Sequence, residues 1–234
     1  MKIVSWNCNG AFRKKFHLLE QFDADVLIIQ ECENPALSNS IDYIEWAHTY
    51  IWVGNTKSRG LGVFAKERLM LSEIKFNQNF GNSCLKWFIP FNYNNQLDFV
   101  AVWTQKTFNG EFRYIGQFYK LLINNYEEIN NLIFIGDFNS NKIWDYKRLE
   151  GDHSSCVRLL EDKGIVSLYH EHMGVNQGEE SDYTFYLHRN LKKPYHIDYA
   201  FLPKDLLDRA TLSIGLHNDW LAFSDHMPLF INIK

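Results

Sequence analysis

Residues 132–139 read Leu-Ile-Phe-Ile-Gly-Asp-Phe-Asn, an apolar run that ends in a polar, turn-forming string. Four consecutive apolar residues favour a strand that is buried on both faces. Gly, Asp and Asn favour turns, so the chain should leave the strand at this string. The sequence therefore predicts that Asp137 and Asn139 stand at the carboxyl end of a buried strand.

The same arrangement occurs twice nearer the N-terminus. Asn7 directly follows the apolar run 3–6, and Glu31 follows the run 26–29 after one glutamine. Both runs have the length and composition of buried strands. Two more polar side chains are thus expected at the ends of strands.

Two later polar segments come before strands instead of after them. Asp198 precedes the run 199–202, while Asp225 and His226 precede the run 228–233. The start of one strand lies at the same edge as the end of an antiparallel neighbour. If these two strands run against the first three, all of the polar residues meet at one edge of a mixed sheet.

The remaining pattern indicates the fold class. Further strand candidates span 60–65, 85–91 and 97–103, and Asn94-Asn95 reads as a hairpin turn. Helical spacing of apolar residues occurs between the strands, for example after Ser154 and Ser155, which we take as helix N-caps. Strands and helices do not alternate regularly. We expect an α/β fold, a four-layer sandwich of two packed mixed β-sheets flanked by helices.

Composition limits the possible functions. The chain has 234 residues, of which 46% are apolar, and this suits one domain spanning residues 1–234. Its net charge of -4 excludes a strongly basic polyanion binder, so any nucleic-acid footprint must be a local patch. The four cysteines show no zinc-binding spacing, and neither a secretion signal nor a membrane-length apolar run is present. We expect a soluble, cytoplasmic protein.

The clustered carboxylates indicate a metal. Glu31, Asp137, Asp198 and Asp225 would bring several negative charges together, which is unfavourable without a cation. Because the donors are oxygens, Mg²⁺ or Mn²⁺ is favoured over zinc. A hard cation, carboxylates and one histidine, here His226, form a recurring set for phosphoryl transfer.

Each motif alone has an ordinary explanation as a strand end, a turn or a helix cap, but the ordered set is specific. It resembles the motifs of the endonuclease/exonuclease/phosphatase superfamily, most closely the exonuclease III and abasic-site endonuclease branch. The resemblance rests on five strings that span nearly the whole chain: Ser5-Trp6-Asn7-Cys8-Asn9-Gly10, Gln30-Glu31, Gly136-Asp137-Phe138-Asn139, Ile197-Asp198-Tyr199 and Ser224-Asp225-His226-Met227-Pro228.

The resemblance implies a metal site. Glu31 would be the principal ligand of Mg²⁺ or Mn²⁺, with Asn7 beside the metal or the phosphate. Asp225 would lie near the metal. The chain departs from the branch at Asn9, where an acidic residue is common, and the missing charge would weaken metal binding.

The resemblance also implies catalytic roles. Asp137 would orient and deprotonate the attacking water, and Asn139 would hold the phosphate. His226 would contact a phosphate oxygen, with Asp198 fixing its ring. Tyr114, at the head of a helical segment, matches the phosphate-contacting tyrosine of the family.

Substrate contacts are expected from two further groups of residues. Basic residues flank the active edge, and those assigned to phosphate are Arg13, Lys142 and Arg189, with Lys14, Lys15, Lys147, Arg148, His188, Lys192 and Lys193 in the same segments. In the abasic-site branch a small apolar pocket admits the flipped sugar, and the matching positions are Phe185, Tyr195 and Ile197. Tyr195 and Ile197 alternate with His196 and Asp198, so one strand can serve both purposes only if it bends there. The alternative is that all three are core residues.

The predicted function is that of a metal-dependent phosphodiesterase, a hydrolase that acts on nucleic acid. DNA is the expected partner, with cleavage at abasic sites or 3′ ends and a place in DNA repair. Neither a membrane nor an obligate protein partner is indicated. One alternative is a phosphatase or phosphodiesterase for a small-molecule or lipid phosphate, because a fold does not fix its substrate. The other is an inactive relative that binds nucleic acid.

Overall fold

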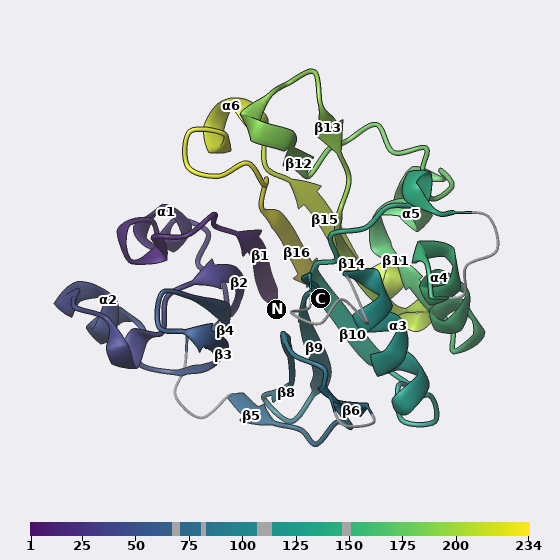
Figure 1. Ribbon diagram of the computed structural model, residues 1–234, viewed down its shortest axis with the longest axis horizontal. Helices are drawn as coiled ribbons and strands as arrows, with labels where there is room; N and C mark the ends of the chain where they lie inside the picture. Colours follow the sequence, from purple (N-terminus) through teal and green to yellow (C-terminus); the bar gives the residue numbers. More distant parts are fainter. Residues whose placement is uncertain (67–70, 81–82, 107–113, 147–150) are drawn as a thin grey trace.

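Two six-stranded sheets pack face to face, with helices on both outer surfaces (Figure 1). The computed structural model describes residues 1–66, 71–80, 83–106, 114–146 and 151–234. The predicted four-layer α/β sandwich of two mixed sheets is confirmed. None of the helices in these ranges is long and apolar enough to cross a membrane.

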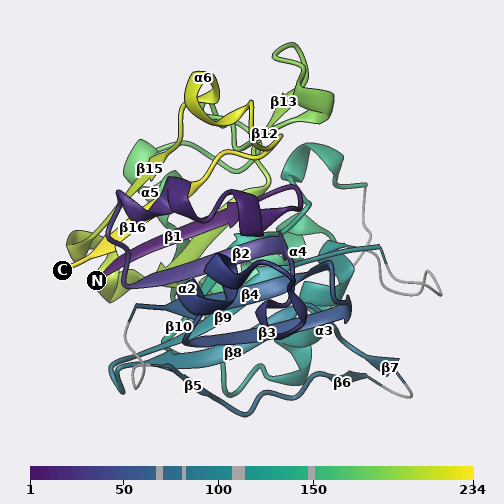
Figure 2. The same ribbon diagram turned by 90° about the vertical axis from the view of Figure 1, so that its left-hand side faces the viewer.

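The first sheet contains both ends of the chain and has the strand order β15-β16-β1-β2-β4-β3. β1 pairs in parallel with β2 and antiparallel with β16, which brings the last strand beside the first. Its strands are β1 (Lys2–Asn7), β2 (Val26–Cys32), β3 (Tyr50–Thr56), β4 (Arg59–Ala65), β15 (Ala210–Ile214) and β16 (Leu229–Ile233). Figure 2 shows the two termini close together at one end of these strands.

The second sheet has the order β11-β14-β10-β9-β8-β5. β10 pairs in parallel with β9 and antiparallel with β14. Its strands are β5 (Leu71–Glu73), β8 (Phe88–Tyr93), β9 (Leu97–Trp103), β10 (Leu132–Asp137), β11 (Ile165–Ser167) and β14 (Asp198–Pro203). Two small ribbons complete the strands: β6 (Asn79–Phe80) with β7 (Ser83–Cys84), and β12 (Phe185–Tyr186) with β13 (Pro194–Tyr195).

Three apolar clusters hold the layers together. One fills the space between the sheets, and β1 shows how a strand serves two clusters, since Ile3 faces that space while Val4 faces outward. The second packs α1 (His17–Glu20) and α2 (Ile41–Trp46) on the first sheet, and the third packs α3 (Ile115–Asn124) and α4 (His153–Asp162) on the second. The other helical segments are α5 (Leu168–Met173), α6 (His217–Trp220) and the 3₁₀ turns η1 (Phe12–Lys14), η2 (Pro35–Leu37), η3 (Lys142–Trp144), η4 (Leu187–Arg189) and η5 (Lys204–Arg209).

Local predictions fare unevenly. The hairpin turn is confirmed, because Asn94 and Asn95 both have positive φ, 56° and 53°, between β8 and β9. The strand expected to begin at residue 85 begins at Phe88, since Trp87 has a φ of 74° that an extended strand cannot contain.

The expected caps of α4 are wrong. Asp152 is the N-cap, and its Oδ1 accepts from the backbone N of Ser155 at 2.9 Å. Ser154 and Ser155 lie inside the first turn, where Ser154 donates to the carboxylate of Asp145. The carboxylate of Asp152 therefore takes the capping position that was expected of the serines.

Candidate active site

Polar side chains from both sheets meet at one end of the strands. Asn7 ends β1, Asp137 ends β10 and Asp198 begins β14, directly opposite Asp137 in the antiparallel register. His226 comes just before β16. The antiparallel arrangement predicted from the sequence is confirmed, but a meeting at the edge of one mixed sheet is wrong: the residues come from the ends of two stacked sheets. Two sheets allow side chains to converge from opposite walls.

The Gly-Asp-Phe-Asn string has a backbone that only glycine permits. Gly136 has a φ of 150°, and a Cβ there would lie 1.9 Å from the carbonyl oxygen of Val102 on β9. Just beyond it, Asn139 donates its backbone N to Asp137 Oδ1 at 2.8 Å and its side-chain Nδ2 to Asp137 Oδ2 at 2.9 Å. Asn139 Nδ2 also donates to the backbone O of Thr104 at 3.0 Å. The turn thus holds the Asp137 carboxylate from two sides.

A buried carboxylate–histidine–carboxylate row forms the centre of the site. Nδ1 of His226 lies 3.0 Å and 3.2 Å from the two carboxylate oxygens of Asp198. The other ring nitrogen, Nε2, lies 3.9 Å from Oδ2 of Asp137. All three side chains are at most 6% exposed. The Asp198 carboxylate therefore fixes the ring so that Nε2 faces Asp137.

The row shifts two pKa values. Burial opposes a charge on His226, but the carboxylates of Asp198 and Asp137 raise the pKa of its imidazole above the usual value. Burial also raises the pKa of Asp137, against the lowering effect of His226 and with a further rise from Asp198. The result is a positively charged imidazole beside a carboxyl group that readily accepts a proton.

The opening motif supports His226 from behind. Nε1 of Trp6 donates to the backbone O of His226 at 3.0 Å. Ser224 Oγ donates to the backbone O of Asn7 at 2.6 Å and accepts from the backbone N of His226 at 3.0 Å. β1 and the segment before β16 are thereby locked together at the site.

Glu31 reaches the site through an irregularity in β2. The register with β4 shifts between Gln30 and Cys32, and Glu31 has a φ of 65°. Its Oε1 forms an ion pair with Arg59 and lies 3.4 Å from Nδ2 of Asn7, which also donates to Asp137 at 2.9 Å. The Asn7 amide therefore bridges the two carboxylates.

The chemistry of these donors fits a hard divalent cation. Glu31 and Asp137 present oxygens on either side of Asn7, and no thiol is among them. Among the described residues, Asp137, Asp198 and His226 also bring ligand atoms within 4.8 Å of one another. Asp198 and His226 are hydrogen-bonded to each other, which leaves Glu31 and Asp137 as the carboxylates that could hold a cation.

Asp225 belongs to a neighbouring contact. Its Oδ1 accepts from Nδ2 of Asn9 at 2.9 Å, and the backbone N of Asn9 donates to Oδ1 of Asn7 at 3.1 Å. The branch often has an acidic residue at the position of Asn9, and that residue would repel Asp225. The amide of Asn9 donates a hydrogen bond to Asp225 instead. Asp225 is linked to Asn7 through Asn9.

Comparison with known proteins identifies the family. The model of the Endonuclease/Exonuclease/phosphatase family matches residues 4–226. The chain belongs to this family. No curated protein matches the sequence.

Several solved structures share this fold. An AP endonuclease from Archaeoglobus fulgidus is 17% identical, with a TM-score of 0.70 over 100% of this chain and 99% of that one. The 3'-5' exonuclease NExo from Neisseria meningitidis is 15% identical, with a TM-score of 0.73 over 100% of both chains. NExo from Neisseria, described as a 3' phosphatase bound to product DNA hairpin, is 16% identical, with a TM-score of 0.74 over 100% of this chain and 99% of that one. At these identities the likeness shows the fold.

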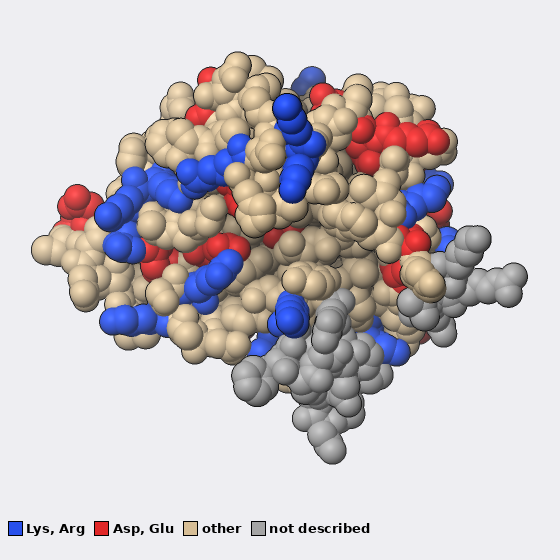
Figure 3. Space-filling model, turned by 45° about the horizontal axis from the view of Figure 1, so that its top comes forward, with Lys and Arg blue, Asp and Glu red and all other residues tan. Residues whose placement is uncertain are grey.

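Two of the basic residues that were expected to contact phosphate bind other groups of the protein. Arg13 forms an ion pair with Glu33, and Arg189 donates to the backbone O of Ala222 and of Phe223 at 3.2 Å and 3.4 Å. Lys142 begins η3 and is exposed, while Lys147 and Arg148 lie outside the described residues. Figure 3 shows acidic side chains recessed in the surface with Lys and Arg side chains around them.

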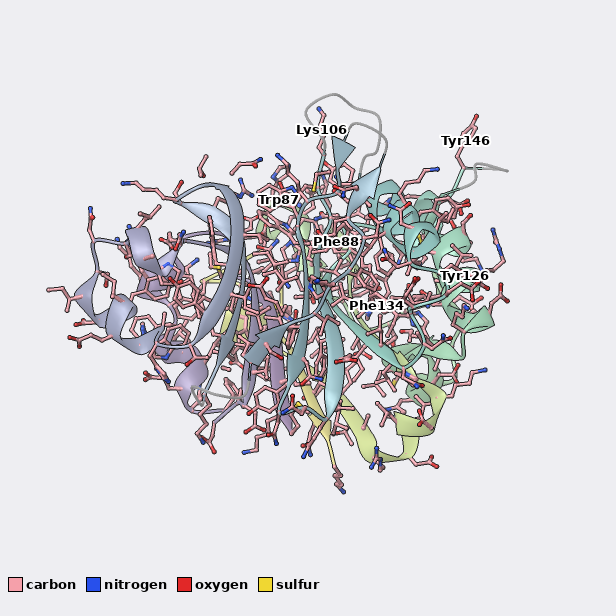
Figure 4. The ribbon with its side chains drawn as sticks, turned by 90° about the horizontal axis from the view of Figure 1, so that it is seen from below. Trp87, Phe88, Lys106, Tyr126, Phe134 and Tyr146 are labelled. Atoms are coloured by element: carbon pink, nitrogen blue, oxygen red, sulfur yellow. The ribbon has the colours of Figure 1, made fainter. Side chains whose placement is uncertain are left out.

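Tyr114 lies where the sequence predicts, at the head of α3. It is the N-cap residue, with a φ of 50° and 41% exposure, and its backbone N donates to the backbone O of Gln105 at 2.8 Å. Lys106 and Tyr146 both project at the top of Figure 4. Contact of Tyr114 with a phosphate stays a prediction.

The three residues predicted to line an apolar pocket do not all lie in the same surroundings. The ring of Phe185 lies 4.5 Å from that of His226 and 6.4 Å from that of Tyr195, centroid to centroid. Ile197, in contrast, is 2% exposed. The chain leaves β13 at Tyr195 and enters β14 at Asp198, which supplies the break that the sequence pattern required.

Sequence reasoning missed three residues that shape the site. Arg59 pairs with Glu31 from the start of β4, and Trp144 stands beside Tyr195 with 5.0 Å between ring centroids. Thr184 Oγ1 accepts from the backbone N of Ile197 and of Asp198. The only sequence signals were a basic residue before a glycine-rich strand and a tryptophan after the central motif.

Proposed function

We propose that this chain is a divalent-metal-dependent nuclease that hydrolyses phosphodiester bonds of DNA at abasic sites or 3′ ends. The observation that carries the proposal is the buried row Asp137–His226–Asp198 beside Glu31, with Asn7 bridging the two acidic sides. Residues 1–234 would form one domain that contains every catalytic group. A place in DNA repair in the cytoplasm follows from the substrate and from the scattered cysteines.

In the proposed reaction Asp137 accepts the proton of the attacking water. Its position is set by hydrogen bonds from Asn139 and Asn7, and its raised pKa suits a proton acceptor near neutral pH. The side-chain amide of Asn139 donates to Asp137 and to Thr104, so we assign Asn139 to orienting the base. These two bonds use both N–H groups of the amide, so the phosphate contact expected from the sequence would require one of them to break.

His226 and Asp198 act on the phosphate. The charged imidazole donates from Nε2 to a non-bridging phosphate oxygen, which gains charge in the transition state. Asp198 holds Nδ1 and keeps the ring charged and oriented. A cation bound by Glu31 and Asn7 would neutralise phosphate charge and stabilise the leaving oxygen.

Three observations support nucleic acid as the substrate. Solved structures of this fold are described as an AP endonuclease, a 3'-5' exonuclease and a 3' phosphatase bound to a DNA hairpin. Basic residues surround the acidic site on the exposed face. The row of aromatic rings that starts at Phe185 offers surfaces on which bases could stack.

A cleavage panel tests the proposal. Labelled duplexes with one abasic site, duplexes with a 3′-recessed or 3′-phosphate end, single-stranded DNA, RNA and inositol or lipid phosphates are incubated with Mg²⁺ or Mn²⁺. We expect cleavage of DNA, weakened steeply by salt because phosphate contacts dominate binding. The Asp137→Asn variant, purified identically, measures contaminating nuclease. Rapid turnover of a small phosphate ester with no cut in any polynucleotide would instead establish the phosphatase alternative.

A further inference from the structure

A row of aromatic rings leads from the reactive histidine to the solvent. Phe185 lies 4.5 Å from His226, Tyr195 lies 6.4 Å from Phe185, and Trp144 lies 5.0 Å from Tyr195, all between ring centroids. The planes of Phe185 and Tyr195 are 30° apart. His226 is 5% exposed, whereas Trp144 is 51% exposed. The outermost ring therefore has an exposed surface at the outer end of a row that begins beside the phosphate-binding group.

Trp144 stands on a rigid base. It ends η3, whose N-cap Asn141 accepts from the backbone N of Ile143 with its side chain and from the backbone N of Trp144 with its own backbone O, both at 3.0 Å. The buried Asn141 amide also donates to the backbone O of His196 at 2.9 Å and to Glu180 at 3.1 Å. η3 is thus fixed to the segment that carries Asp198, and the ring needs little ordering when a ligand binds.

A flat, exposed ring at the end of this row suits a nucleobase. Stacking of a base on an aromatic side chain is favourable for any base, because every base has a π-face. Lys142 is exposed in the same 3₁₀ turn, where its charge can meet the phosphate of the stacked nucleotide. Inside a duplex both faces of each base are covered by its neighbours, so a ring such as Trp144 stacks more readily on an unpaired base.

We infer that Trp144, backed by Tyr195, stacks on an unpaired nucleobase of the strand whose phosphate His226 contacts. The inference rests on the proposed nuclease function and refines its substrate to DNA with a single-stranded or frayed strand at the site. Trp144 is then a residue of substrate specificity, while Phe185 stays next to the reacting group.

Binding and turnover together test the inference. Fluorescence anisotropy of a labelled oligothymidylate and of a blunt duplex is measured in the Asp137→Asn background, so that no probe is cut. Trp144→Ala should weaken oligothymidylate binding by about 5- to 150-fold, the range for loss of one stacked base, and change duplex binding little. Trp144→Phe should keep most of the affinity, since a ring remains. Ile143→Ala, in the same turn and 55% exposed, is the matched control and should bind as the parent does.

The outcomes separate this inference from the proposed function. With Asp137 intact, Trp144→Ala should raise KM for single-stranded DNA, whereas Ile143→Ala should leave that KM unchanged. Equal oligothymidylate affinity of Trp144→Ala and its parent would overturn the inference while DNA cleavage by the wild type stands. A matching loss in Trp144→Phe, together with a lower Tm, would show a structural role and also overturn it. If the wild type neither binds nor cuts any polynucleotide, the proposed function fails and the inference falls with it.

Discussion

Thr184 is the strongest test of how the site is positioned. Its side chain is buried, and Oγ1 accepts from the backbone N of Ile197 at 2.9 Å and of Asp198 at 3.0 Å. The backbone O of Thr184 accepts from Met227 N at 2.7 Å. One residue therefore joins the strand that carries Asp198 to the segment that carries His226.

Valine at this position keeps the shape and removes the acceptor. Two buried N–H groups then lack a partner, at about 1–3 kcal/mol each, so Thr184→Val should lower the free energy of unfolding by about 2–6 kcal/mol. Thr184→Ser keeps the oxygen and loses one methyl group, which costs about 1 kcal/mol. The difference between the two variants isolates the hydrogen bonds from the packing.

Urea unfolding and steady-state kinetics measure the two effects. We expect Thr184→Val to be clearly less stable than Thr184→Ser, and its kcat to fall because Asp198 no longer holds its position. Thr184→Ser should keep a kcat close to that of the wild type. A Thr184→Val variant as stable and as active as Thr184→Ser would refute the reasoning, since Oγ1 would then hold nothing.

Three further predictions concern the turn, the pH dependence and the histidine pair. Gly136→Ala should cost about 3 kcal/mol or more in urea unfolding, because the added Cβ meets a carbonyl oxygen at 1.9 Å, whereas Gly116→Ala, with nothing within 4 Å of its Cβ, should raise stability by about 0.5–1 kcal/mol. Burial lowers the pKa of His196 from 6.5 to about 4, so between pH 6.5 and pH 4 the unfolded chain binds a proton that the folded chain does not. The free energy of unfolding should therefore fall by about 3 kcal/mol as the pH drops from 6.5 to 4. A free energy of unfolding that does not change over this pH range would contradict the burial. Asp198→Asn and His226→Ala should each lower kcat by about 10²-fold or more, and the double variant should lose far less than the product; full additivity would mean that the two residues do not act together.

The positions of the main site residues could be predicted from the sequence because the end of a strand depends on the local hydrophobic pattern. A mainly apolar run shows where a buried strand ends, so the hydrophobic pattern by itself places Asn7 and Asp137 at strand ends. Glu31 was expected beyond its strand and lies within β2, since the strand continues through a register shift to Cys32. A bulge leaves no mark in the hydrophobic pattern.

Two supporting contacts that no motif marks were not predicted. Arg59 is 28 residues from Glu31, and nothing in either local sequence couples them. Thr184 is 14 residues from Asp198, and its buried position depends on how the β12–β13 ribbon folds back. The predicted cap of α4 was wrong for a different reason: Asp152 and two serines are all good N-cap residues, and the local sequence does not show which of them the helix uses.

The central claim is that Glu31 and the Asp137–His226–Asp198 row form a metal-dependent hydrolytic site. The most direct measurement is the initial rate of cleavage of an abasic-site duplex against Mg²⁺ concentration, for the wild type, Glu31→Gln and Glu33→Gln. Glu33 is the matched control, because it is a buried carboxylate two residues away that pairs with Arg13. The account predicts that a chelator abolishes cleavage and that Glu31→Gln lowers the rate by about 10²-fold and needs more Mg²⁺, while Glu33→Gln keeps the Mg²⁺ dependence of the wild type. Full activity of Glu31→Gln at low Mg²⁺, or cleavage that persists in chelator, would contradict it.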